Sequence, residues 1–125
     1  MSRFIFIAVG AALGANARYL VGSWAGQRFG ASFPYGTLLV NISGSLLLGF
    51  LLTLGTERLS ISPELRLMLA VGFLGSYTTF SSYTVESINL LGSSGLSSAI
   101  LNIIGNNLIG LLCALAGAQL ARMLR

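Results

Sequence analysis

The 125-residue sequence contains no histidine, no aspartate and no lysine. Without histidine, serine–histidine and cysteine–histidine catalysis are excluded, and so are nearly all zinc and iron sites. The single cysteine, Cys113, lies inside an apolar run, so a disulfide framework is excluded as well. These absences argue against an enzyme of the common hydrolase or metalloenzyme classes.

Charged side chains are also scarce. They make up 8% of the sequence, against about 25% in soluble domains, while 54% of the residues are hydrophobic. A soluble domain of this length could not bury so much apolar surface, so we expect the lipid bilayer to be the solvent. The basic residues are all arginines that mostly flank apolar runs, which indicates membrane-edge anchors and argues against binding of nucleic acid.

Four apolar segments are long enough to cross a bilayer, since a helix needs about 20 apolar residues to span the hydrocarbon core. They cover residues 3–26, 35–55, 65–91 and 97–122. Short polar turns join them, and Ser62 followed by Pro63 is typical of a helix start. The sequence therefore predicts an all-α membrane protein with a single four-helix transmembrane domain over residues 1–125.

Four crossings would place both chain ends and the second connection on the same side of the membrane. That side holds most of the arginines, namely Arg3, Arg58, Arg66, Arg122 and Arg125. Because cytoplasmic flanks carry the excess of arginine, this bias predicts cytoplasmic termini in the cytoplasmic (inner) membrane. The first segment lacks a clear cleavage pattern and contains Arg18, so we expect it to remain in the mature protein.

The first segment also carries small residues at four-residue spacing, with Arg18 occupying one step of the repeat. Glycines at such spacing, including Gly10, Gly14 and Gly22, allow helix backbones to approach closely within or between subunits. A guanidinium inside a membrane helix costs about 2.5 kcal/mol or more, so Arg18 needs a specific role. Three roles stay open: reaching to the membrane interface, capping backbone carbonyls of a neighbouring helix, or attracting anions to an aqueous entrance.

Rows of polar side chains follow two other segments at four-residue spacing, which places each row on one helix face. The second segment carries Thr37, Asn41 and Ser45, and the fourth carries Asn102 and Asn106. Amide side chains in lipid need hydrogen-bond partners. Bonds between helices alone would explain one asparagine, whereas two polar rows favour a water-accessible pathway through the protein.

The third segment combines glycines with a run of hydroxyl side chains, GFLGSYTTFSSYT at residues 72–84. Hydroxyls compete for backbone hydrogen bonds, so we predict that this helix is broken near its middle, at residues 75–79. Carbonyls released at such a break can line a cavity or bind a hard cation such as Na⁺. After the break, Phe80 and Tyr83 lie three residues apart on one face, where their positive ring edges can face an anion.

At these residues the sequence resembles the Fluc (CrcB-like) family of fluoride ion channels. The resemblance extends over essentially the whole chain in length, helix layout and motif order. It is carried by GANAR at residues 14–18, PYGTLLVN at 34–41 and GFLGSYTTFSSYTVE at 72–86. The last stretch is the most specific, because the family pattern there is Gly-Gly-x-Thr/Ser-Thr-Phe-Ser-Thr-Phe, followed by a Ser or Thr and a glutamate region.

The resemblance implies an antiparallel, dual-topology homodimer that is not an enzyme and whose partners are F⁻, Na⁺ and membrane lipid. It implies a structural Na⁺ at the dimer centre, held by the backbone carbonyls of Gly75 and Thr78 of each subunit. It also implies that Arg18 lies at the vestibule and dimer interface. The implied lining of the two fluoride pores is Thr37, Asn41, Thr79, Phe80, Ser81, Ser82, Tyr83, Glu86, Asn102 and Asn106.

The function implied by the resemblance is passive fluoride export. HF crosses lipid and ionises inside the cell, and a channel lets the negative membrane potential expel the trapped F⁻. Three residues depart from the family pattern: Ser76 replaces a glycine, Tyr83 replaces the second phenylalanine, and Gly110 replaces a serine. The phenol of Tyr83 would bind F⁻ more tightly or slow its passage. The arginine bias also conflicts with dual insertion, which needs nearly balanced flanks.

Three alternative classes have less support. A small multidrug-resistance-like four-helix cation exporter has a similar size, but it depends on an acidic residue in the first helix, where this chain has Arg18 and no carboxylate. A purely structural membrane subunit would not need two polar rows and an interrupted helix. An intramembrane hydrolase would have Glu86 as its only candidate general base.

Overall fold

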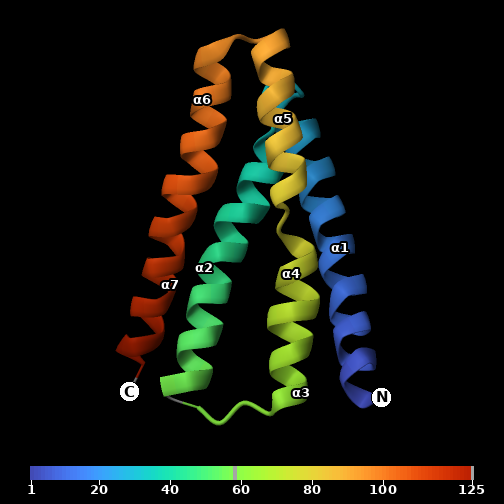
Figure 1. Cartoon of the computed structure of the whole chain (residues 1–125), viewed down its shortest axis with the longest axis vertical. Helices are drawn as coiled ribbons and strands as arrows, with labels where there is room; N and C mark the ends of the chain where they lie inside the picture. The colour runs from blue at the N-terminus through green and yellow to red at the C-terminus, as the bar shows by residue number, and fades with distance from the viewer. Residues whose placement is uncertain (58, 125) are drawn as a thin grey trace.

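The computed structural model describes residues 1–57 and 59–124, so the predicted membrane-edge arginines Arg58 and Arg125 lie outside the described residues. The described residues form helices and short connections that pass four times along the long axis of the molecule (Figure 1). The two chain ends lie at the same end of the bundle, as four crossings require. The all-helical fold class and the order of the four segments are therefore confirmed.

The first two passes are long, uninterrupted helices. They are α1 (Ser2–Phe29) and α2 (Tyr35–Glu57). Gly30 ends α1 with a φ of 83°, in the left-handed region that favours glycine, and its amide donates to the Gly26 carbonyl at 3.0 Å. The first turn therefore begins at Gly30, which extends α1 beyond its predicted end at residue 26.

The third pass is assembled from short helices. It comprises α3 (Pro63–Arg66), the π-helix η1 (Leu67–Leu74), α4 (Gly75–Tyr77) and, after a break, α5 (Phe80–Ser93). The Ser62 Oγ accepts the Leu65 amide at 3.3 Å, and Pro63 occupies the first helical position. The predicted helix start at Ser62 and Pro63 is therefore confirmed, and the break appears as an interruption of this one pass.

The fourth pass also contains a π-helical stretch. It comprises α6 (Leu96–Ile104), the π-helix η2 (Gly105–Ile109) and α7 (Gly110–Met123), which follow one another without a break. Both Asn106 and Asn107 lie in η2. Short π-helical stretches inside α-helices often occur at functional sites, because the widened turn shifts the helix register.

Three passes are long and apolar enough to cross a membrane as continuous helices. They are α1, α2 and the continuous stretch Leu96–Met123. The third pass is not one continuous helix, because Thr78 and Thr79 interrupt it. A broken helix is tolerated in lipid only where its backbone is buried in protein or lines a cavity. The backbone at the break should therefore be buried or border a cavity.

Glycines bring α1 into backbone contact with the third pass. A Cβ added at Gly14 would collide with the carbonyl oxygen of Phe73, and one added at Gly10 would collide with that of Met68. By contrast, a Cβ added at Gly22 or Gly26 would meet no atom within 4 Å. The first part of the glycine repeat is therefore used for packing against the third pass, whereas the Cβ positions of Gly22 and Gly26 face open space, although Gly36 of α2 closely approaches the Gly22 backbone.

Candidate functional site

The break in the third pass occurs at Thr78 and Thr79. Both backbones are extended, with φ −84° and ψ 159° at Thr78 and φ −151° and ψ 121° at Thr79. The Thr79 Oγ1 accepts the Ser82 amide at 3.2 Å and so caps the start of α5. The break predicted at residues 75–79 is confirmed but is shorter, because Gly75 is helical and the hydroxyl residues, not the glycines, interrupt the helix.

Asn41 on α2 binds the exposed backbone of this break. Its Oδ1 accepts the Thr79 amide at 2.8 Å, and its Nδ2 donates to the Thr79 carbonyl at 2.9 Å. The same Nδ2 donates its second hydrogen to Asn106 Oδ1 on η2 at 2.7 Å. One uncharged side chain thus replaces the helical bonds that Thr79 loses and ties α2, the break and η2 together.

Further hydrogen bonds of asparagine side chains connect Asn41 to the fourth pass. The Nδ2 of Asn106 donates to the carbonyl and the Oδ1 of Asn102, at 2.9 and 3.0 Å. Asn102 in turn donates to Ser87 Oγ at 3.0 Å, and it is 0% exposed. The structure therefore places Asn102 inside the subunit as support for Asn106, and not on the lining of the cavity at the break.

A cavity of about 240 Å³ lies beside the break. Its lining includes the amides of Asn41 and Asn106 and the rings of Phe80 and Tyr83. The two ring centroids are 5.5 Å apart with an interplanar angle of 64°, an edge-on arrangement. Thr79 also lines this cavity. The structure thus brings together amide groups and aromatic edges, which are polar groups without a fixed charge.

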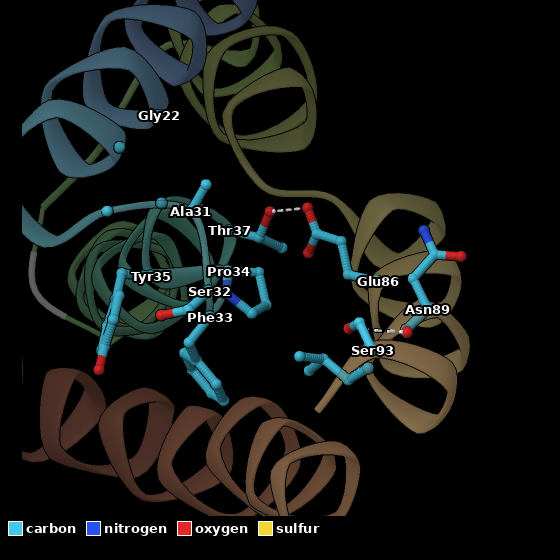
Figure 2. A pocket seen from close by; sticks show the side chains of 14 residues that line it. Gly22, Ala31, Ser32, Phe33, Pro34, Tyr35, Thr37, Glu86, Asn89 and Ser93 are labelled. Carbon is cyan, nitrogen blue, oxygen red and sulfur yellow. Dashed lines mark hydrogen bonds between the residues drawn. The ribbon is translucent and has the colours of Figure 1, made fainter. Parts of the chain in front are cut away.

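A second cavity, of about 380 Å³, lies toward the connection between α1 and α2. Figure 2 shows Thr37 and Glu86 pointing toward each other across it, and Thr37 Oγ1 donates to Glu86 Oε1 at 2.7 Å. The other carboxylate oxygen, Oε2, is buried and has no hydrogen-bond partner among the described residues. Because Thr37 lies one helical turn from Asn41 on α2, the two cavities border successive turns of one polar helix face.

The polar residues of this second cavity that were not predicted from the sequence include Asn89 and Ser93. Both lie on α5, and Ser93 Oγ donates to the Asn89 carbonyl at 3.1 Å (Figure 2). Their positions three and seven residues after Glu86 would have placed them on its helix face. The spacing signal was therefore present, but Ser93 lay beyond the predicted end of the third segment at residue 91.

The hydroxyls of Ser81 and Ser82 lie outside both cavity linings. They contact Thr79 instead: its Oγ1 donates to Ser82 Oγ at 3.1 Å and lies 3.4 Å from Ser81 Oγ. The structure thus gathers these hydroxyls at the first turn of α5, where each is within hydrogen-bond reach of Thr79. It does not join them to the cavity formed by Asn41 and the rings.

Arg18 reaches from α1 to the break. Its Nη1 donates to the Thr78 carbonyl at 3.4 Å. Among the three roles left open by the sequence, this contact matches the capping of a backbone carbonyl on a neighbouring helix. The cost of a guanidinium within the bundle is thereby offset in part by a carbonyl that the break has released.

The carbonyls of Gly75 and Thr78 are among those at the break that have lost their helical partners. The amide that would bond Gly75 in a continuous helix is that of Thr79, which donates to Asn41. The amide that would bond Thr78 is that of Ser82, which donates to Thr79 Oγ1. Among the described residues no three His, Cys, Asp or Glu side chains gather, so a cation here would depend on such carbonyls. Released carbonyl oxygens suit a hard cation such as Na⁺.

Comparison with known proteins gives matches over nearly the full length. The family model described as CrcB-like protein, Camphor Resistance (CrcB), matches residues 5–118. The chain is 49% identical over 120 residues to the fluoride-specific ion channel FluC of Roseiflexus sp. (strain RS-1), covering 96% of this chain and 97% of that protein. It is 47% identical over 124 residues to the FluC of Sulfurihydrogenibium sp. (strain YO3AOP1), covering 99% and 100%.

The FluC of Chloroflexus aurantiacus (strain ATCC 29366 / DSM 635 / J-10-fl) is 47% identical over 122 residues, covering 98% of this chain and 97% of that protein. These matches agree with the resemblance carried by the sequence motifs and with four helical passes. They argue against the alternative classes of cation exporter, structural subunit and hydrolase. The chain therefore belongs to the CrcB-like family, as a multi-pass membrane protein that is not an enzyme.

Proposed function

We propose that this protein is a fluoride-selective ion channel. The observation that carries the proposal is the cavity at the break, where the amides of Asn41 and Asn106 meet the ring edges of Phe80 and Tyr83. The names of the three relatives support it, since each is called a fluoride-specific ion channel. Membership of the same family over nearly the full length makes a shared function the simplest explanation.

Uncharged donors and ring edges suit a small anion that must also leave. An amide N–H donates to F⁻, and the positive edge of an aromatic ring attracts it weakly. A fixed positive charge in the same place would hold the ion too strongly for conduction, which requires binding that is favourable but easily reversed. The larger Cl⁻ accepts weaker hydrogen bonds and needs a wider passage. A narrow site whose donors are placed to form short hydrogen bonds would therefore reject Cl⁻.

Both amide hydrogens of Asn41 are already used, one by the Thr79 carbonyl and one by Asn106. An anion beside Asn41 must therefore replace one of these acceptors, and Asn106 Oδ1 is the side-chain acceptor that can move. The exchange would keep the number of hydrogen bonds at Asn41 constant as the ion enters and leaves. Thr37 lies one turn before Asn41 on α2. Together with Glu86 of α5 it lines the second cavity, which would border the next part of the path.

We infer that two subunits form an antiparallel homodimer with two pores. Phe80 is 75% exposed in the single subunit although it lies at the break, so a second subunit would cover it. Na⁺ at the centre would be held by the carbonyls of Gly75 and Thr78 from both subunits, since one subunit offers too few oxygens. Na⁺ would supply positive charge that holds the crossed breaks together, while Arg18 would lie near this interface.

The proposed role in the cell is passive fluoride export across the cytoplasmic membrane. HF enters as a neutral acid and ionises, and the negative membrane potential drives the trapped anion outward. The antiparallel dimer requires one subunit in each orientation, although the arginine bias by itself favours cytoplasmic termini.

Flux from liposomes tests the function directly. Vesicles containing the purified protein and loaded with KF or KCl are given a K⁺ ionophore, and external F⁻ and Cl⁻ are followed with ion-selective electrodes. We expect rapid F⁻ efflux and Cl⁻ efflux no faster than from empty vesicles. Absence of F⁻ efflux from correctly reconstituted protein, or equal efflux of both halides, would contradict the proposal.

A further inference from the structure

We propose that Tyr83 donates its hydroxyl hydrogen to the permeating F⁻, and that Asn107 is a positioning residue that orients this hydroxyl. The inference rests on the proposed function and names a specificity-determining pair within it. Asn107 Nδ2 lies 2.8 Å from the Tyr83 hydroxyl, and both residues line the cavity at the break. The Tyr83 hydroxyl can donate to F⁻ only if the hydrogen shared in this bond is carried by Asn107 Nδ2.

The orientation of the Asn107 amide follows from its second contact. Its Nδ2 also lies 2.8 Å from the Ile103 carbonyl oxygen, which can only accept a hydrogen bond. If the amide were reversed, its oxygen would face that carbonyl oxygen and the two acceptors would repel each other. Nδ2 therefore carries one hydrogen to Ile103 and the other to Tyr83, and the phenol oxygen is the acceptor.

The hydroxyl hydrogen of Tyr83 consequently remains available. A phenol has one donor hydrogen, and the bond from Asn107 uses only its oxygen. No other acceptor for this hydroxyl occurs among residues 1–57 and 59–124, and Tyr83 is only 9% exposed. A buried donor without a partner is costly, so an anion in the adjoining cavity is its natural acceptor.

Two neighbouring asparagines on the π-helix η2, Asn106 and Asn107, both line the cavity at the break. Asn106 bonds to Asn41, while Asn107 bonds to Tyr83. Asn41 and Tyr83, which lie on different passes, thus both contribute hydrogen-bond donors to the cavity.

A hydroxyl donor would strengthen fluoride binding more than chloride binding, because F⁻ accepts the shorter and stronger hydrogen bond. We expect Tyr83→Phe, which keeps the ring, to raise the half-saturating F⁻ concentration for flux about tenfold, in line with the loss of one hydrogen bond to an ion. The selectivity for F⁻ over Cl⁻ should fall in the same variant. Tyr77→Phe is the matched control, since that hydroxyl contacts Ser43 and does not line the cavity.

Asn107→Leu tests the positioning role separately. It should raise the half-saturating concentration several-fold, and the double variant should be no worse than Tyr83→Phe alone, because the two residues act through one hydroxyl. A loss caused only by disturbed helix packing would instead add to the effect of Tyr83→Phe. Near-ultraviolet tyrosine absorption offers a readout besides flux: adding F⁻ should change the spectrum of the wild-type protein and much less that of Tyr83→Phe.

The outcomes separate this inference from the proposed function. The Tyr83→Phe variant could elute from a size-exclusion column as the wild-type protein does and keep the wild-type half-saturating F⁻ concentration and selectivity for F⁻ over Cl⁻. That result would overturn the donor role of Tyr83, while the channel function would stand. If Tyr83→Phe behaves as expected but Asn107→Leu matches the wild type, the positioning role is overturned. If the wild-type protein itself conducts no F⁻, the proposed function fails first.

Discussion

Asparagine side chains perform much of the polar chemistry inside this bundle, because one amide offers two donors and an acceptor without a net charge. Asn41 uses all of this capacity at the break, and Asn106 passes the hydrogen bonding on to Asn102. A charged residue in the same place would need a partner of opposite charge or pay a large desolvation penalty. At the scale of single residues, the polar contacts around Asn41 are therefore made by neutral groups.

The aromatic edge at the break can be tested with a single substitution. Phe80→Ile keeps an apolar side chain but removes the positive ring edge, so we expect F⁻ flux to fall at least tenfold in the liposome assay. Since Phe80 packs little within its own subunit, thermal stability of the subunit fold should change by less than about 1 kcal/mol.

Phe4→Ile is the control for that substitution. Phe4 is similarly exposed within the subunit, at 77% against 75%, but it lies on α1 away from both cavities. Its replacement should leave the flux unchanged. Equal F⁻ flux in Phe80→Ile and Phe4→Ile would contradict a role of the Phe80 ring edge in conduction.

Helical elements in this fold approach one another at glycines and depart from α-helical geometry near the cavities. The π-helix η1 of the third pass contacts Gly10 and Gly14 of α1 through the carbonyls of Met68 and Phe73, and the pass is interrupted at the break. The second and fourth passes meet in the same manner, since a Cβ at Gly117 would collide with the Leu46 carbonyl. Close backbone contact holds these elements in lipid, where a hydrophobic driving force between helices is absent.

Gly14→Ala tests this close contact at the element scale. The added methyl group would collide with the Phe73 carbonyl, which belongs to the backbone and cannot rotate away. We expect a loss of about 1–3 kcal/mol in stability, seen as a lower melting temperature of the detergent-solubilised protein. Gly92→Ala is the control, because its Cβ would meet nothing within 4 Å and its melting temperature should stay at or above that of the wild type. Equal melting temperatures for both variants would contradict the packing argument.

At the scale of the whole molecule, the single subunit has a small buried core. This core of hydrophobic side chains lies around Val40, Leu74 and Tyr77, and many large apolar side chains are exposed in the single subunit. Lipid can cover apolar side chains, but it cannot satisfy polar groups such as the carbonyls at the break. A second subunit would cover both kinds of surface, which is why we propose a dimer with a central cation.

Removing Na⁺ is the corresponding test at the scale of the assembly. After prolonged dialysis against K⁺ at the same ionic strength, we expect the dimer fraction, measured by light scattering during size exclusion, to fall together with F⁻ flux. The change should take hours, because carbonyls of two crossed subunits would bury the ion. A parallel sample dialysed against Na⁺ controls for time. Full flux and an intact dimer after verified removal of Na⁺ would contradict the proposed cation.

Several features could be predicted from the sequence because they depend on the local order of residues. The four passes follow from the length of apolar runs, and the helix start at Ser62 and Pro63 follows from capping chemistry. The break follows from consecutive hydroxyl residues, and it covers only Thr78 and Thr79 of the predicted residues 75–79 because Gly75 is helical. The proximity of Phe80 and Tyr83 follows from a spacing of three residues on one helix.

The hydrogen-bond partners were decided only by the tertiary structure. Asn41 binds residues 38 and 65 positions away, so its partners depend on how three passes approach one another. The same is true of Asn102, which donates to Ser87 on the third pass, and of Arg18, which reaches a carbonyl on another pass. The sequence by itself determined that polar side chains would lie within the membrane-spanning segments. Glycine contacts and π-helical turns then determined which of these groups meet, because small shifts in helix register select the partners of a side chain.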